Sequence, residues 1–193
     1  MKTQFISLMS HEFRTPITVI QTCAYLLETY FSMQQKDKFD NTLHKLLIAI
    51  DTTTKLLDNI LFLDEIKEHS VMFSKIDIIA FIKYVVEEVS TDLEAKQSIT
   101  VNTNVESLIL LTDEKLIRKT INNLLANAIK YSPATSQITI DINDATSELN
   151  IIIADTGPGI ADDVVTKIFE TFVRSMTVTN ISGAGLGLSI VKN

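Results

Sequence analysis

The 193-residue sequence has little of what secreted and membrane proteins use for stability and anchoring. Its single cysteine, Cys23, cannot form an internal disulfide, which fits a reducing compartment. No apolar run approaches the roughly 18 to 20 residues that span a bilayer. The opening Met1-Lys2-Thr3-Gln4 leads into a polar segment rather than a signal peptide. We therefore expect a soluble, cytoplasmic polypeptide that makes no membrane contact itself.

Glycine and proline are also scarce, and the chain has no excess of positive charge. With 5 Gly and 3 Pro the chain has no low-complexity linker. Its net charge of −7 argues against a duplex nucleic-acid binder and against an electrostatic hold on anionic lipid, because both need a basic face. Hydrophobic residues make up 46% of the chain, enough for real cores. The length favours one small helical domain and one compact mixed domain.

Residues 1–69 carry two apolar runs at helical spacing, separated by a polar break at residues 33–38. The first run is Ile6, Met9, Phe13, Ile17, Ile20, Ala24, Leu27 and Phe31, and the second is Leu43, Leu46, Ile50, Thr53, Leu57 and Ile60. Intervals of three and four predict an antiparallel hairpin of two long helices. Because two helices alone bury little, we expect a second copy to complete a four-helix bundle, which makes the protein a homodimer.

His11 lies on the first predicted helix, away from its apolar stripe. At about 100° per residue it is roughly 200° from Met9 and from Phe13, so its imidazole should face solvent. Glu12 is placed to accept its proton or to hold its tautomer while the other ring nitrogen acts as a nucleophile. Pro16 has no N–H for the Glu12 carbonyl and should disturb the helix at a cost of about 3 kcal/mol. His11 is therefore a candidate nucleophile beside a helix weak point.

The periodicity changes after Glu68-His69-Ser70, which predicts one domain over residues 1–69 and another over residues 70–193. In the second domain, Asp77 is expected to cap a helix over residues 78–92.

Alternating runs in this domain predict strands over residues 71–76 and 98–105. Two further runs, residues 138–142 and 149–153, predict an antiparallel hairpin. Helices mixed with an antiparallel sheet imply a two-layer α/β sandwich with helices on one face.

The predicted helix from Asp113 to about Tyr131 carries a polar stripe beside its apolar one. Asn123, Asn127 and Lys130 lie in line at intervals of four and three. Asn is a mediocre helix former, and a surface face more often uses Glu, Lys or Gln. Carboxamide oxygens suit a hard cation such as Mg²⁺ and leave phosphates to supply the remaining charge. Solvated or backbone-bonded amides are the alternative interpretation.

An aspartate and two glycine clusters follow this helix. By strand alternation Asp155 projects from the apolar face at the end of a strand, where it needs a donor such as the exocyclic amine of adenine. Gly157 and Gly159 allow a sharp turn and a close approach of the backbone to a ligand. Glycines return just before the final helical run, where backbone N–H groups favour phosphate. These glycines are Gly183, Gly185 and Gly187.

In this order the motifs resemble the catalytic core of two-component sensor histidine kinases, over nearly the whole chain. The boxes are Ser10-His11-Glu12-Phe13-Arg14-Thr15-Pro16 (H), Asn123 to Ser132 (N), Asp155 to Ile160 (first glycine box), Ile168 to Phe172 (F) and Gly183 to Leu188 (second glycine box). The resemblance implies an α+β fold: the helical hairpin, then a sandwich-type ATP-binding domain like those of gyrase and chaperones. It also implies further strands after the second glycine box, so we expect this domain to be truncated at its C-terminal strands.

The resemblance gives each motif a role. It implies that His11 receives the γ-phosphoryl group of ATP, that Glu12 orients it or takes its proton, and that Glu12-x-x-Thr15 serves a phosphatase activity. Asn123 and Asn127 are implied to sit at Mg²⁺. The residues implied to bind ATP are Asn123, Asn127, Lys130, Tyr131, Asp155, Gly157, Gly159, Ile160, Phe169, Phe172, Gly183, Gly185, Leu186 and Gly187.

The implied function is autophosphorylation of His11 and phosphoryl transfer to an aspartate of a response-regulator receiver domain. The parent protein is then expected to be a larger, inner-membrane receptor whose cytoplasmic part this is. Two alternatives stay open. A related ATPase shares the asparagine and glycine motifs but would lack the H-box hairpin, and a non-catalytic dimerisation and docking fragment would keep only the helical half competent.

Overall fold

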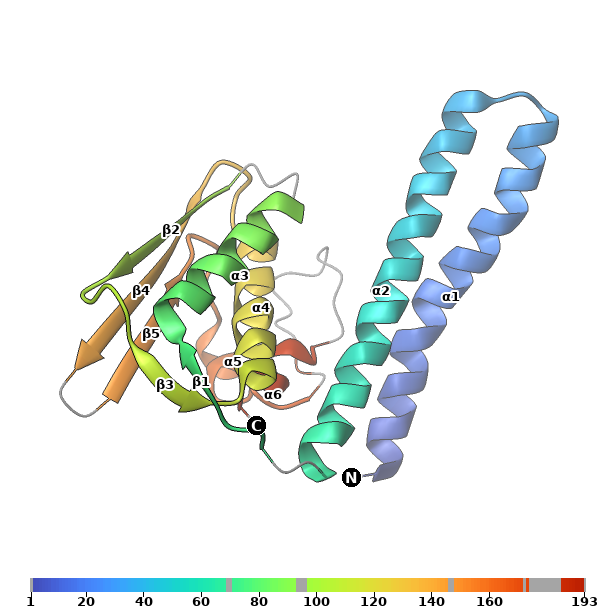
Figure 1. The fold of residues 1–193 in the computed structure, drawn as a ribbon. Coiled ribbons are helices and arrows are strands. Elements are labelled where there is room, and N and C mark those ends of the chain that lie inside the picture. Colours follow the sequence, from blue (N-terminus) through green and yellow to red (C-terminus); the bar gives the residue numbers. More distant parts are fainter. Residues whose placement is uncertain are drawn as a thin grey trace. The chain divides into compact units, whose positions relative to one another are not determined.

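The computed structural model describes residues 2–68, 71–92, 97–145, 148–171, 173 and 185–192. The chain divides into two compact units, Met1–Glu68 and His69–Asn193, which are described separately (Figure 1). Among the described residues, no helix combines the length and apolar character that crossing a membrane requires.

The first unit is the predicted antiparallel hairpin, formed by α1 (Lys2–Ser32) and α2 (Lys36–Glu68) (Figure 1). Gln34 makes the reversal between them with a φ of 55°. Pro16 lies inside α1, yet the helix continues through it. The proline is buried in the hairpin, as is Cys23 one heptad later. Packing against α2 therefore offsets the local cost of the missing N–H.

Helix α2 presents two apolar stripes rather than the single one predicted. One stripe recurs every seven residues and is buried in the hairpin; its members are Thr42, Ala49, Leu56 and Leu63. The second stripe is between 37% and 57% exposed; its members are Leu43, Leu47, Ile50, Leu57 and Leu61. The predicted run took Leu43, Ile50 and Leu57 from this exposed stripe, and its other three members lie between the two stripes and are half-buried: Leu46, Thr53 and Ile60. The second stripe has no partner among the described residues of this unit.

The strands of the second unit form two sheets. In one, β1 (Ser74–Asp77) pairs antiparallel with β3 (Ile109–Thr112). In the other, β4 (Gln137–Ala145) lies between β2 (Ser98–Thr103), to which it is parallel, and β5 (Glu148–Ala154), to which it is antiparallel. The predicted hairpin is confirmed in β4 and β5. The expectation of an antiparallel sheet is wrong for β2, because the chain runs from β2 to β4 through a crossover that contains β3 and α4.

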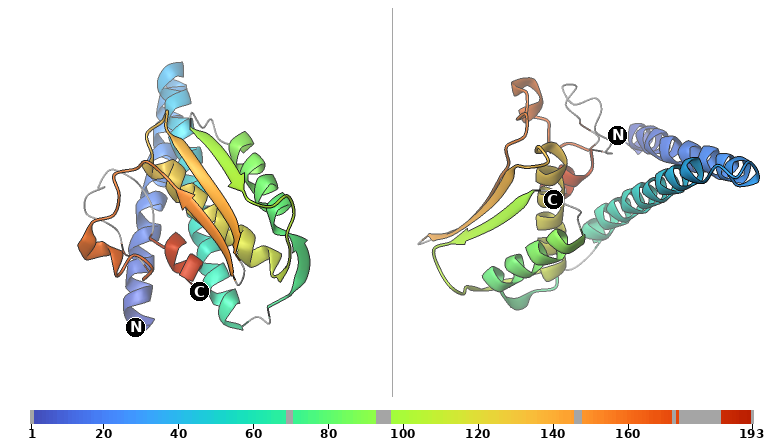
Figure 2. Two further views of the ribbon diagram at one scale, coloured as in Figure 1. Left: turned by 90° about the vertical axis from the view of Figure 1, so that its left-hand side faces the viewer. Right: turned by 90° about the horizontal axis from the view of Figure 1, so that it is seen from above.

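Helices α3 (Ile78–Asp92) and α4 (Glu114–Tyr131) cover one face of the larger sheet, as Figure 2 shows. The inward residues of β4, Ile138, Ile140 and Ile142, are fully buried in one core with Ile82 of α3 and Leu125 of α4. The predicted two-layer sandwich is confirmed. Two short helices follow, α5 (Asp162–Val165) and α6 (Gly187–Lys192), and α6 packs against α4.

Aspartates fix the starts of both long helices of this unit. Asp77 Oδ1 accepts from the backbone N–H of Ile79 at 3.1 Å, and its Oδ2 accepts from Ser107 Oγ at 2.7 Å. The Ser107 hydroxyl, with help from backbone N–H groups, lowers the pKa of Asp77. The predicted cap is therefore found, and it also ties β1 to the segment before β3.

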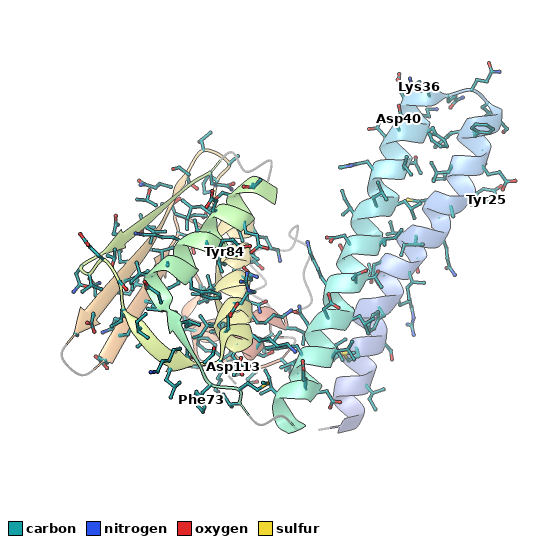
Figure 3. The ribbon with its side chains drawn as sticks, in the orientation of Figure 1. Tyr25, Lys36, Asp40, Phe73, Tyr84 and Asp113 are labelled. Atoms are coloured by element: carbon teal, nitrogen blue, oxygen red, sulfur yellow. The ribbon has the colours of Figure 1, made fainter. Side chains whose placement is uncertain are left out.

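Asp113, labelled in Figure 3, is the N-cap of α4. Its Oδ1 accepts from the backbone N–H of Leu116 at 3.1 Å, and its Oδ2 accepts from that of Met72 at 2.9 Å. These bonds, that of Met72 foremost, lower the pKa of Asp113. The helix that carries the asparagine stripe is thus fixed at its start to the segment that leads into β1.

Arg118 holds α4 against α3 on their outer side. Its Nη1 lies 2.8 Å from Glu88 Oε2, and its guanidinium carbon lies 5.0 Å from the Phe81 ring centroid and 5.5 Å from that of Tyr84. Figure 3 labels Tyr84 on α3. The ion pair and the contacts of the guanidinium with the two rings resist sliding of one helix along the other.

Candidate functional site

His11 occupies the solvent-facing position on α1 that helical geometry predicts. Its side chain is 74% exposed, and its Nδ1 lies 3.8 Å from Glu12 Oε1, just beyond hydrogen-bonding distance. Thr15 Oγ1 donates a long hydrogen bond of 3.5 Å to the His11 carbonyl oxygen. The imidazole is therefore open to a reactant, with a carboxylate on its Nδ1 side.

The polar stripe of α4 is partly buried along its whole length. Asn123 Nδ2 donates to the Lys119 carbonyl oxygen at 2.8 Å, so the first amide is bonded to its own helix. Asn127 lies one turn further on, and its side chain makes no hydrogen bond to any residue that the structure describes. Lys130 Nζ lies 3.3 Å from Tyr131 Oη and 4.8 Å from the centroid of that ring. The two asparagines therefore differ in environment.

The loop after β5 folds back onto the end of α4. Asp155 is exposed, and its Oδ1 accepts from the Gly157 N–H at 2.7 Å. A Cβ on Gly157 would lie 2.8 Å from that oxygen and 3.0 Å from the Tyr131 carbonyl oxygen. Only glycine fits there without a shift. The carboxylate thus receives a backbone donor on Oδ1. Gly159 continues the turn with a φ of 74°.

The second glycine segment, which is the described part of the second glycine box at residues 185–188, meets α4 at Asn123. Gly185 has a φ of 65°, and Leu186 after it is 1% exposed. A Cβ on Gly187, the first residue of α6, would lie 3.0 Å from Asn123 Oδ1. The structure therefore brings together three motifs that are far apart in sequence, because Gly157 of the first glycine segment and Gly187 of the second each lie close to α4. The sequence stripe located Asn123, but only the fold shows that its oxygen faces Gly187.

The remaining predicted residues fall into two groups. Ile160 and Phe169 are 50% and 43% exposed, so their apolar side chains are available to a ligand. Phe172 and Gly183 lie outside the described residues. Within the described part of the chain, no three or more His, Cys, Asp or Glu side chains gather in a way that could hold a metal ion.

Two family models match the chain, one for each unit. Residues 1–69 match the His Kinase A (phospho-acceptor) domain. Residues 112–193 match the histidine kinase-, DNA gyrase B- and HSP90-like ATPase domain, which makes the second unit an ATP-binding domain.

Known proteins show the same two units in the same order. The sensor histidine kinase WalK of Bacillus subtilis is 27% identical over 197 residues, which cover 99% of this chain and 32% of WalK. The crystal structure of full-length ShkA in complex with AMPPNP is 26% identical, with a TM-score of 0.61 over 98% of this chain and 40% of ShkA. That of ThkA in complex with the response regulator TrrA is 23% identical, with a TM-score of 0.69 over 89% of this chain and 50% of that one, and it supports the fold.

The chain spans between 32% and 52% of the length of the first three curated relatives it matches. The phosphoacceptor model, the ATPase model and relatives over nearly the whole chain agree with the motif order and with the fold. The chain therefore belongs to the two-component sensor histidine kinases and comprises their catalytic core.

Proposed function

We propose that the chain transfers the γ-phosphoryl group of ATP to His11 and then to an aspartate of a response regulator. One observation carries this proposal: an exposed histidine on a helical hairpin shares the chain with two glycine segments gathered on a helix that carries an asparagine stripe. A related ATPase needs no such hairpin. ATP as the proposed substrate supports a cytoplasmic location for the reaction.

Asp155, Lys130 and Tyr131 are the proposed anchors of the nucleotide. Asp155 Oδ1 is engaged by the Gly157 N–H, so Oδ2 is the oxygen available to the exocyclic amine of adenine. Lys130 supplies a positive charge on the same helix for the phosphates. The exposed side chains of Ile160 and Phe169 offer apolar surface to the base.

Asn127 is the residue best suited to hold Mg²⁺. Its side chain is half-buried and has no hydrogen-bond partner in the described part of the chain, which leaves its carboxamide oxygen available. When bound, the cation would offset charge on the β- and γ-phosphates. Lys130, one turn further along the helix, adds a second positive charge from the protein itself.

His11 is the proposed nucleophile in its neutral form. Because Nδ1 faces Glu12, Nε2 is the nitrogen presented to the γ-phosphorus. An N–P bond forms as the bond from phosphorus to the β-phosphate oxygen breaks, ADP leaves, and the Nδ1 proton passes to Glu12 or to water. We also propose a phosphatase activity towards the regulator. In that reaction Glu12 and Thr15 would position the water that removes the regulator's phosphoryl group.

The partners proposed are a second copy of the chain and a receiver domain. The exposed stripe of α2, defined above, has the heptad spacing of a helix-bundle seam and supports a homodimer through the hairpin. The complex of ThkA with the regulator TrrA, a protein of the same fold, supports the second partner.

Incubation with γ-labelled ATP and Mg²⁺, followed by acid and alkali treatment, tests the proposal. Acid-labile, alkali-stable label on the protein is expected, because phosphohistidine has that stability. Released phosphate without protein label would instead indicate an ATPase, and neither product would indicate a docking fragment. The variant His11→Gln should bind ATP but take up no label; persisting label would reject His11 as the acceptor.

A further inference from the structure

We propose that Asn123 is a positioning residue that fixes the start of α6 against α4, rather than a ligand of Mg²⁺. The inference rests on the proposed function, because the segment it positions is the second glycine segment of the nucleotide site. It assigns the two asparagines of the stripe to different tasks.

The Asn123 carboxamide is hydrogen-bonded through its nitrogen and lies close to Gly187 through its oxygen. Its Nδ2 donates to the Lys119 carbonyl oxygen at 2.8 Å, which sets the orientation of the amide plane. Its Oδ1 then points to Gly187, where an added Cβ would lie 3.0 Å away. An oxygen that already packs against backbone has little room for a cation with its hydration shell.

The contact at Gly187 determines where the second glycine segment lies. Leu186 is 1% exposed and Ile190 is 3% exposed, so α6 is anchored by apolar packing on either side of this close approach. Ser189 Oγ donates to the Leu186 carbonyl oxygen at 2.7 Å and closes the first turn. A larger residue at Gly187, or a differently oriented Asn123, would move α6 and the preceding Gly185 away from α4.

Asn127 provides the internal comparison. It lies one turn further along the same stripe, and its side chain lacks a hydrogen bond within the described ranges. The two side chains have the same chemistry, so a difference between their variants reports on environment alone.

A double-mutant cycle tests the contact. The variants are N123A, G187A and N123A/G187A, with N127A as the matched control, all in the full chain. Nucleotide affinity is measured by calorimetry with ADP in excess Mg²⁺ and again in EDTA, and chemical unfolding is measured without nucleotide. We expect G187A to weaken ADP binding by at least tenfold in both conditions. The double variant N123A/G187A should bind ADP at least fivefold more tightly than G187A does, because the oxygen that opposes the new Cβ is gone.

The Mg²⁺ dependence separates positioning from metal binding. N123A should weaken ADP binding by the same factor with Mg²⁺ and with EDTA, whereas N127A should lose affinity only with Mg²⁺. The variant N123D keeps an oxygen for a cation but cannot donate to the Lys119 carbonyl. It should therefore behave as N123A does.

Three results would overturn the proposal: additive effects of N123A and G187A in both binding and unfolding, a loss in N123A confined to Mg²⁺, or full Mg²⁺-dependent binding by N123D. The wild-type chain could bind no ADP while the effects of N123A and G187A on the free energy of unfolding are still not additive. In that case the proposed function fails and the contact of Asn123 with Gly187 is supported.

Discussion

Asp113 offers the sharpest test of how the nucleotide unit is held together. The variant Asp113→Ala removes the N-cap bond to Leu116 and the bond to Met72 at once. Loss of an N-cap costs about 1 kcal/mol. The second bond is at an exposed site, where water replaces it, and it adds roughly 0.5 to 1 kcal/mol. We therefore expect a loss of about 1.5 to 2 kcal/mol, which is a fall in Tm of about 4 to 8 °C for a unit of this size.

The variant Asp113→Asn separates the two bonds. Asn caps helices as well as Asp does, but its single carbonyl oxygen cannot serve both Leu116 and Met72. We expect it to lose only about 0.5 to 1 kcal/mol. The matched control is Glu114→Ala, which removes an exposed ion pair of 3.4 Å to Arg118 and should cost under about 0.5 kcal/mol. Urea unfolding of each variant at neutral pH measures these differences.

The pH dependence of stability provides an independent test of the role of Asp113. The folded-state pKa of Asp113 is lowered below 3.8, so its contribution is complete above that pH and is lost as pH falls through the folded-state pKa. Stability of wild type should therefore decline more steeply on the acid side than that of Asp113→Asn, which does not titrate. Unchanged stability in Asp113→Ala, or equal losses in the Ala and Asn variants, would refute the reasoning.

Two further predictions concern the site and the dimer. Gly157→Ala places a Cβ 2.8 Å from Asp155 Oδ1 and 3.0 Å from the Tyr131 carbonyl, so we expect at least about tenfold weaker ADP binding by calorimetry; wild-type affinity would show that the loop can move aside. Leu47→Asp puts a charge on the exposed stripe of α2 and should give a monomer in light scattering, whereas Ile48→Asp, at an equally exposed position off the stripe, should leave the dimer intact. A dimer in both would place the interface elsewhere.

Local chemistry explains what could be predicted from the sequence. The sequence predicts Asp77 as the cap of α3 and a helix that begins near Asp113. In the structure both side chains accept from backbone N–H groups two or three residues away, as short acceptors at helix starts do. The β4–β5 hairpin followed from two alternating runs joined by a short turn. The exposed position of the His11 side chain follows from the angle between successive residues of a helix.

The features that could not be predicted from the sequence depend on contacts between residues far apart in the chain. Strand β3 is four residues long, Ile109–Thr112, and it is held by its pairing with β1 and by the packing of Leu110 against the core. The parallel alignment of Ser98 with Gln137 depends on a crossover that no local pattern encodes. The contact of Asn123 with Gly187 likewise requires the fold, because the two residues lie on different helices.

The parallel pairing of β2 with β4 also sets an order of events during folding. Asn102 and Asp141, bonded across these strands, are 39 residues apart, so a long loop must close before the central sheet is complete. The hairpin of α1 and α2 joins segments that are adjacent in the sequence, so closing the loop between them costs much less conformational entropy. We therefore expect the helices to form first as the chain is synthesised. Two chains could then associate through them before either has a finished nucleotide site.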